Sequence, residues 1–150
     1  MKSIKILAIG VLLLGVVGLV LGAIFIGQGV SKNSQLTEAM RVEHVTLGIE
    51  SAELEGQVID SLSEARQAGD IIREHRREIA PTYSDLLGGG RYNPEDLEQL
   101  QYAQALNLEN YLYLAVVAFG LTQSVMGSGV FMVFTGLALT GTGVALYRLS

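Results

Sequence analysis

The sequence predicts an all-α membrane protein with two transmembrane helices joined by an extracytoplasmic helical hairpin or small helical bundle. Two uncharged stretches, residues 6–27 and 111–147, bracket the chain, and all 15 acidic residues lie between them. At about 1.5 Å per residue, a helix as long as the first stretch covers roughly 33 Å, which matches the ~30 Å hydrocarbon core of a bilayer. Both spans must be helical, because unpaired backbone groups are not tolerated in lipid and two segments cannot close a β-barrel.

The first stretch reads as a retained signal anchor. Lys2 and Lys5 give it a short positive flank, as a secretory signal peptide would have. However, its apolar run exceeds the ~7–15 residues of a signal peptide, and no clean A-x-A-like cleavage site follows. We therefore expect a cytoplasmic N-terminus at residues 1–5 and a transmembrane helix at residues 6–27.

The second stretch is too long for one perpendicular span, since a helix of this length would cover roughly 55 Å. We favour an apolar juxtamembrane helix at residues 111–124, a transmembrane helix at 125–147 and a cytoplasmic C-terminus at 148–150. Two alternatives remain open. One is a pair of short spans that turn at residues 127–129, and the other is a single kinked or strongly tilted helix.

The distribution of Lys and Arg beside the spans predicts the orientation. Lys2 and Lys5 precede the first span and Arg148 follows the second, which places both termini in the cytoplasm of a cell-membrane protein. The segment 28–110 is then an extracytoplasmic acidic domain. The sequence pI of about 4.9 argues against nucleic acid as a partner, and the absence of cysteine excludes disulfides and thiolate metal sites.

Within the acidic domain, helical periodicity predicts a helix at about 34–80 that ends at Pro81, because proline lacks the N–H and restricts the preceding residue. A Gly-rich turn at 81–93 follows. The next helix is predicted from residue 94, with Asn93 as N-cap and Pro94 at the first helical position. The first arm, residues 28–80, would reach about 80 Å as one rod, whereas the second arm, from residue 94 to the bilayer near residue 125, would reach roughly 46 Å. A break is therefore expected between residues 43 and 56, near Gly48 or Gly56.

Small residues in the spans point to close helix packing. Gly18 and Gly22 have the G-x-x-x-G spacing on one face of the first span. Two stripes of small residues run along the second apolar stretch. Small side chains let helix backbones approach, and two stripes on one helix predict more than one neighbour. The predicted interface consists of Gly15, Gly18, Gly22, Gly120, Ser124, Gly127, Gly129, Gly136, Gly141 and Gly143.

The sequence predicts no catalytic, cofactor-binding or metal-binding residues. His44 and His75 lack the Glu-x-x-His spacing of carboxylate-bridged metal bundles. The charged run at residues 73–78 is typical of a solvated helix face, and the three glycines at 88–90 indicate a turn, because neither a strand nor a Gly-Lys-Ser/Thr sequence flanks them.

The blocks AGDIIREH and VVAFGLTQSVMGSGVFMVFTGLAL resemble a family of small two-span prokaryotic membrane proteins, which implies the two-span layout and no particular activity. We expect a non-enzymatic accessory or structural subunit of a larger membrane complex, with the lipid bilayer, other membrane subunits or a second copy of itself as partners. The alternative is a membrane-anchored extracytoplasmic sensor or ligand-binding module. Its layout lacks a signalling output, because only three residues follow the second span.

Overall fold

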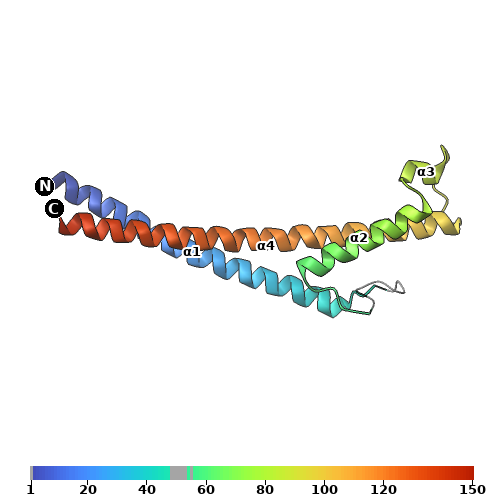
Figure 1. Ribbon diagram of the computed structural model, residues 1–150, viewed down its shortest axis with the longest axis horizontal. Coiled ribbons are helices and arrows are strands. Elements are labelled where there is room, and N and C mark those ends of the chain that lie inside the picture. Colours follow the sequence, from blue (N-terminus) through green and yellow to red (C-terminus); the bar gives the residue numbers. More distant parts are fainter. Residues whose placement is uncertain (1, 48–53, 55) are drawn as a thin grey trace. The chain divides into compact units, whose positions relative to one another are not determined.

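A computed structural model of the protein describes residues 2–47, 54 and 56–150. About 82% of the described residues are helical, and no strand occurs among them. The helices of the described residues, labelled in Figure 1, are α1 (Lys2–Glu43), α2 (Leu62–Ile79), α3 (Tyr83–Leu87) and α4 (Leu97–Arg148). The chain divides into two compact units, Met1–Ser34 with Leu121–Ser150 and Gln35–Gly120, which we call the paired-helix unit and the acidic unit.

The paired-helix unit contains the first part of α1 and the last part of α4. The two helices lie side by side in opposite directions, so the two ends of the chain lie at the same end of the pair (Figure 1). Both helices are long and apolar enough to cross a membrane. Their outer surfaces carry large exposed apolar side chains, among them Ile6 at 72%, Phe131 at 70% and Phe134 at 68%. This is the surface expected of helices that face lipid, where apolar side chains have no reason to be buried.

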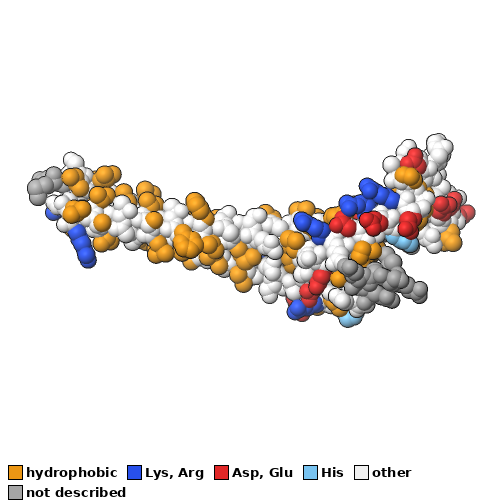
Figure 2. All heavy atoms as spheres, in the orientation of Figure 1, with side chains coloured by type: hydrophobic (Ala, Val, Ile, Leu, Met, Phe, Trp, Pro, Cys, Tyr) orange, Lys and Arg blue, Asp and Glu red, His pale blue; other side chains and the backbone are white. Residues whose placement is uncertain are grey.

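The acidic unit has its own hydrophobic core, between α2, the first half of α4 and the segment before α2. The buried members are Leu47, Leu54, Ile59, Ala65, Ala68, Ile72 and Leu112. Figure 2 shows that the acidic side chains on the visible face gather over this unit, whereas orange apolar side chains cover the paired helices. Basic side chains lie beside the acidic ones and also at the end of the paired helices where the chain begins and ends. The alanines Ala65 and Ala68 supply part of this core, so the core is small. Their short side chains let α2 and α4 approach closely.

The first arm is broken, and α1 ends at Glu43. His44 follows with a positive φ of 50°, and its N–H bonds to the Arg41 carbonyl at 3.1 Å, which closes the helix. The chain then returns, with an isolated bridge between Thr46 and Val58. Gly48, one expected break point, lies outside the described residues; Gly56, the other, has a φ of 70°.

The start of α2 at Leu62 lies beyond the break expected between residues 43 and 56, and it has a local cause. Ser61 is its N-cap and accepts a hydrogen bond from the Glu64 N–H, and the Glu64 carboxylate accepts from the Asp60 N–H at 3.0 Å. This Ser-x-x-Glu pattern resembles a capping box, except that the Glu64 carboxylate accepts from the N–H of the residue before the N-cap and not from that of the N-cap itself. At the other end α2 stops at Ile79, before Ala80 and Pro81, as the proline predicts.

The second arm corrects the prediction in two places. The turn at 81–93 contains the short helix α3, which Thr82 caps and which ends at Gly88 in the left-handed conformation. The predicted helix start at residue 94 is wrong. Asn93 forms a turn, in which its Oδ1 accepts a hydrogen bond from the Glu95 N–H. Asp96 caps the helix instead, because its Oδ1 accepts a hydrogen bond from the Gln99 N–H. From Leu97, α4 continues without interruption through residues 127–129, so the two short spans do not occur.

Candidate functional site

Four small residues spaced seven apart form the inner face of α1 in the paired-helix unit. Ala8, Gly15, Gly22 and Gly29 are buried, whereas most of their neighbours along the helix are exposed. A strict seven-residue spacing keeps one stripe of a helix directed at its partner when the two helices coil around each other with a left-handed twist. The burial pattern therefore identifies the seam along which α4 packs.

The matching face of α4 consists of Gly129, Gly136 and Gly143, which are also buried and also seven apart. The contacts between glycines are reciprocal. A Cβ added to Gly15 would lie 2.8 Å from the Gly136 carbonyl oxygen, and one added to Gly136 would lie 2.8 Å from the Gly15 carbonyl oxygen. At such distances no Cβ fits without moving backbone, so glycine is required at this seam.

The G-x-x-x-G pair contributes unequally. A Cβ on Gly22 would lie 2.7 Å from the Gly129 carbonyl oxygen, but a Cβ on Gly18 would make an ordinary contact of 3.4 Å with Gly136. The tight contact thus follows the seven-residue spacing of Gly15, Gly22 and Gly29, and Gly18 lies beside it.

At three of the other predicted positions the space for a side chain is open. Nothing lies within 4 Å of a Cβ built on Gly120, Gly127 or Gly141, and Gly127, Ser124 and Gly141 are exposed. Gly127 and Gly141 each precede a seam glycine by two residues, about 200° around the helix. The structure thus separates the predicted interface into an inner seam and an outer small-residue face formed by Ser124, Gly127, Ala138, Gly141 and Ala145.

Polar side chains accompany the inner seam. Thr122 donates a hydrogen bond to the Asn33 side-chain oxygen at 3.1 Å, which ties α4 to α1 at one end of the pair. Further along, the buried Thr140 hydroxyl lies against Gly15 and has no hydrogen-bond partner within the described residues. A hydrogen bond such as that between Thr122 and Asn33 holds helices together where lipid offers no competing partner.

In the acidic unit, the buried polar group is an ion pair between α2 and α4. Arg76 and Glu109 are 8% and 7% exposed, and Nε of Arg76 lies 2.6 Å from Oε2 of Glu109. Arg76 also donates to the Tyr102 hydroxyl and lies over the Tyr102 ring, 4.9 Å from its centroid. Because the hydrogen bond to Glu109 favours the charged guanidinium, it raises the pKa of Arg76.

For Arg76 alone, this burial corrects the expectation that residues 73–78 form a solvated face, since Glu74, His75, Arg77 and Glu78 are exposed. The sequence contained a signal for it. Ala65, Gly69 and Ile72 mark the buried face of α2 at helical spacing, and Arg76 is the next position on that face. Glu109 likewise lies seven residues after Tyr102, so both occur on one face of α4.

A second polar group joins the same two helices near Gly69. Asp70 accepts hydrogen bonds from Arg73 and from the Tyr113 hydroxyl, each at 2.6 Å, and its ion pair with Arg73 has the i,i+3 spacing of neighbours on one helix face. A Cβ on Gly69 would lie 3.4 Å from the Tyr113 ring. Burial, followed by the hydrogen bond to Asp70, raises the pKa of Tyr113 to about 12.

The histidines lie apart. His44 directly follows the last residue of α1. His75 is exposed on α2, and its Nδ1 lies 3.5 Å from a Glu78 carboxylate oxygen. No group of three or more metal-ligating side chains is found among the described residues. Comparison with protein-family models, curated proteins and solved structures gives no match, so no family is assigned to the chain.

Proposed function

We propose that this chain is a non-catalytic accessory or structural subunit of a larger integral membrane complex. The outer small-residue face of α4 is the observation that supports it. The inner seam already satisfies the packing of α4 against α1, yet α4 carries a second run of small residues on its opposite side. Helices in lipid associate by close packing, and small residues permit it. A second neighbour, from another subunit or another copy, would use the outer face.

The arrangement of the chain ends supports the proposed orientation. An antiparallel pair brings Lys5 and Arg148 to the same end of the paired-helix unit. Lys and Arg beside spans favour the cytoplasmic side, so both termini are assigned to the cytoplasm and the acidic unit to the extracytoplasmic side, where it would dock a partner. The apolar outer surface of both helices is compatible with lipid and with further helices.

The test replaces Gly127 or Gly141 with leucine. If another helix packs there, the added side chain should weaken association by about 1–3 kcal/mol, by analogy with overpacking in a core. Insertion should be unaffected, because leucine favours the membrane. The readout is the size of the complex and the chains that co-purify in a mild detergent.

Gly10→Leu and Gly27→Leu are matched controls. Both glycines are exposed on α1, and a Cβ on either meets nothing within 4 Å. They add the same bulk to the other helix and should leave the complex intact. Full retention of the assembly in Gly127→Leu and Gly141→Leu would show that the outer face contacts only lipid and would contradict the proposal.

A further inference from the structure

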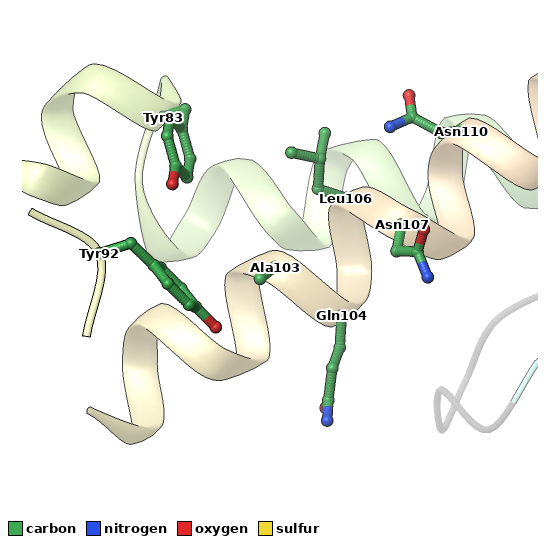
Figure 3. Close-up of a pocket in the computed structure, with 7 residues that line it drawn as sticks. All are labelled: Tyr83, Tyr92, Ala103, Gln104, Leu106, Asn107 and Asn110. Atoms are coloured by element: carbon green, nitrogen blue, oxygen red, sulfur yellow. The ribbon is translucent and has the colours of Figure 1, made fainter. Parts of the chain in front are cut away.

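The acidic unit contains an open cleft of about 500 Å³ that the proposed subunit role does not use. It lies within the ~300–1,000 Å³ range of small-molecule sites. Figure 3 shows that it is lined by Tyr83 from α3, Tyr92 from the segment before α4, and one face of α4. The two tyrosine rings lie at one end, Asn110 at the other and Leu106 between them, whereas the Gln104 side chain points away from the rings.

The Tyr83 ring is exposed but firmly supported. It is 44% accessible, and its centroid lies 6.1 Å from that of Tyr102 at an interplanar angle of 41°. Tyr102 is only 1% exposed and is held by Arg76, which Glu109 fixes in turn. The buried ion pair thus supports an aromatic surface at the cleft. A ring that is mounted on a packed second layer loses little freedom when a ligand covers it.

The second tyrosine is also placed by local hydrogen bonds. Tyr92 is 37% exposed, and the next residue, Asn93, is fixed on both sides. Its N–H donates to the Gln99 side-chain oxygen at 2.8 Å, and its own Oδ1 accepts from the Glu95 N–H at 3.1 Å. Two exposed rings therefore flank one opening, each held by a different part of the fold.

The polar lining is neutral. Asn107 and Asn110 lie three residues apart on α4, and both are exposed. Among the residues that the structure describes, no Lys, Arg, Asp or Glu lines the cleft. A charged ligand would therefore find no counter-charge in it. Each amide offers both a donor and an acceptor, which suits a ligand whose groups do both.

We propose that this cleft binds a neutral saccharide. A sugar ring presents a C–H face that stacks on an aromatic ring, and hydroxyl groups that both donate and accept hydrogen bonds. Tyr83 and Tyr92 supply the rings, and Asn107 and Asn110 supply the amides. A proline-rich peptide also favours aromatic grooves, but its free backbone groups are mainly carbonyl acceptors and would leave the amide oxygens unused. The saccharide accounts for both halves of the lining.

The experiment measures binding of cellotriose and of an N-acetylglucosamine trimer to the purified full chain by calorimetry or ligand-observed NMR. The detergent must carry no sugar headgroup, because a maltoside would itself compete for the cleft; an amine oxide is suitable. Saturable binding of either oligosaccharide is expected. Tyr92→Ala and Asn110→Ala should each weaken it roughly tenfold or more, because each removes a direct contact.

Tyr111→Ala and Gln101→Ala are the matched controls, since both side chains are exposed on α4 and neither lines the cleft. Both should bind like the wild type, and helical circular dichroism should be the same for all four variants. Absence of binding by both sugars, equal binding in all variants, or binding of a proline-rich peptide in place of the sugars would each overturn the proposal. Loss of partner chains in Gly127→Leu is a separate result that this experiment does not touch.

Discussion

Gly22 of α1 and Gly129 of α4 face each other so closely that a Cβ on either would lie 2.7 Å from the carbonyl oxygen of the other. Because each contact is with backbone, neither helix can accommodate a side chain on the other without a backbone shift. Together with Gly15 and Gly136, the pair defines the registry of α1 against α4. The packing of the paired-helix unit thus depends on the absence of side chains at a few positions.

The first prediction concerns this seam. Gly22→Ala should destabilise the paired helices by about 1–3 kcal/mol, because the new methyl group meets backbone atoms. Gly18→Ala should cost much less, since its Cβ would make an ordinary 3.4 Å contact, and Gly10→Ala should cost nothing, since its Cβ meets open space. Thermal unfolding in detergent measures the series. Equal melting temperatures for all three variants would show that α1 and α4 do not pack along these glycines.

The second prediction concerns the buried ion pair. Arg76→Met removes the guanidinium that neutralises Glu109, and breaking such a pair costs about 3–5 kcal/mol because one charge stays buried alone. Replacing both residues, as in Arg76→Met with Glu109→Leu, should recover most of the loss, since an apolar pair of similar volume is often neutral or stabilising. Denaturant unfolding of the single and double variants gives the coupling.

The exposed pair between Arg41 and Asp60 is the control for that cycle. Nε and Oδ2 are 2.5 Å apart, but the Arg41 side chain is 58% exposed. Solvent screens such a pair, so Arg41→Met should cost much less than Arg76→Met. An equal loss in the two single variants would mean that Arg76 and Glu109 are hydrated and do not form a buried pair.

Individual residues show which parts of this structure the sequence can predict and which it cannot. The two apolar helices follow from uncharged runs that only a bilayer or a core can accommodate. The start of α4 cannot be predicted in this way, because Asn93 and Asp96 can both cap a helix. Which of the two caps α4 depends on the hydrogen bond from the Asn93 N–H to the Gln99 side chain. The two stripes of α4 are visible in the sequence, but only the contacts with α1 show which one is the inner seam.

The site residues show the same limit. Gly129, Gly136 and Gly143 were predicted by spacing alone, because a seven-residue period is a local property of the chain. Arg76 was misassigned because a charged residue in a charged run looks solvated unless its partner is known. Glu109 is 33 positions away and on another helix, so local periodicity cannot connect them. The cleft at Tyr83 and Tyr92 was missed for a related reason, since it requires a turn segment to fold against α4.

The third prediction is a pH dependence. The pKa of Tyr113 is raised to about 12 in the folded chain, against an ordinary value near 10. Tyr113 lies in the acidic unit, outside the predicted span at 125–147. Between these two pH values the unfolded chain has lost the proton and the folded chain has kept it, so stability should fall as the pH rises from about 10 to 12.

Tyr113→Phe removes that titration. Its stability should be lower below pH 10, because the hydrogen bond to Asp70 is lost, but its further decline between pH 10 and 12 should be shallower than that of the wild type. Tyr111→Phe, at an exposed position two residues away, should keep the wild-type slope. Unfolding in detergent at several alkaline pH values measures both. Parallel curves for wild type and Tyr113→Phe would exclude a buried hydroxyl at this position.

The last prediction tests the orientation, and the absence of cysteine makes it direct, because each introduced thiol is the only one. Ser3→Cys and Ser150→Cys report the two ends of the chain, and Arg91→Cys reports the acidic unit. Arg91 is exposed and is preferable to its neighbour Gly89, whose φ of 83° disfavours any side chain. The positive charges beside the spans predict that, in intact cells, an impermeant thiol reagent labels Arg91→Cys and leaves both terminal cysteines unlabelled.

Permeabilised cells provide the control, since all three cysteines should then react. Labelling of both termini without Arg91→Cys would invert the orientation and move the acidic unit, with its cleft, to the cytoplasm. Labelling of one terminus only would require an odd number of crossings. Because α1 and α4 run antiparallel and α4 is continuous from Leu97 to Arg148, an odd number would also contradict the pairing of the two helices along the glycine seam.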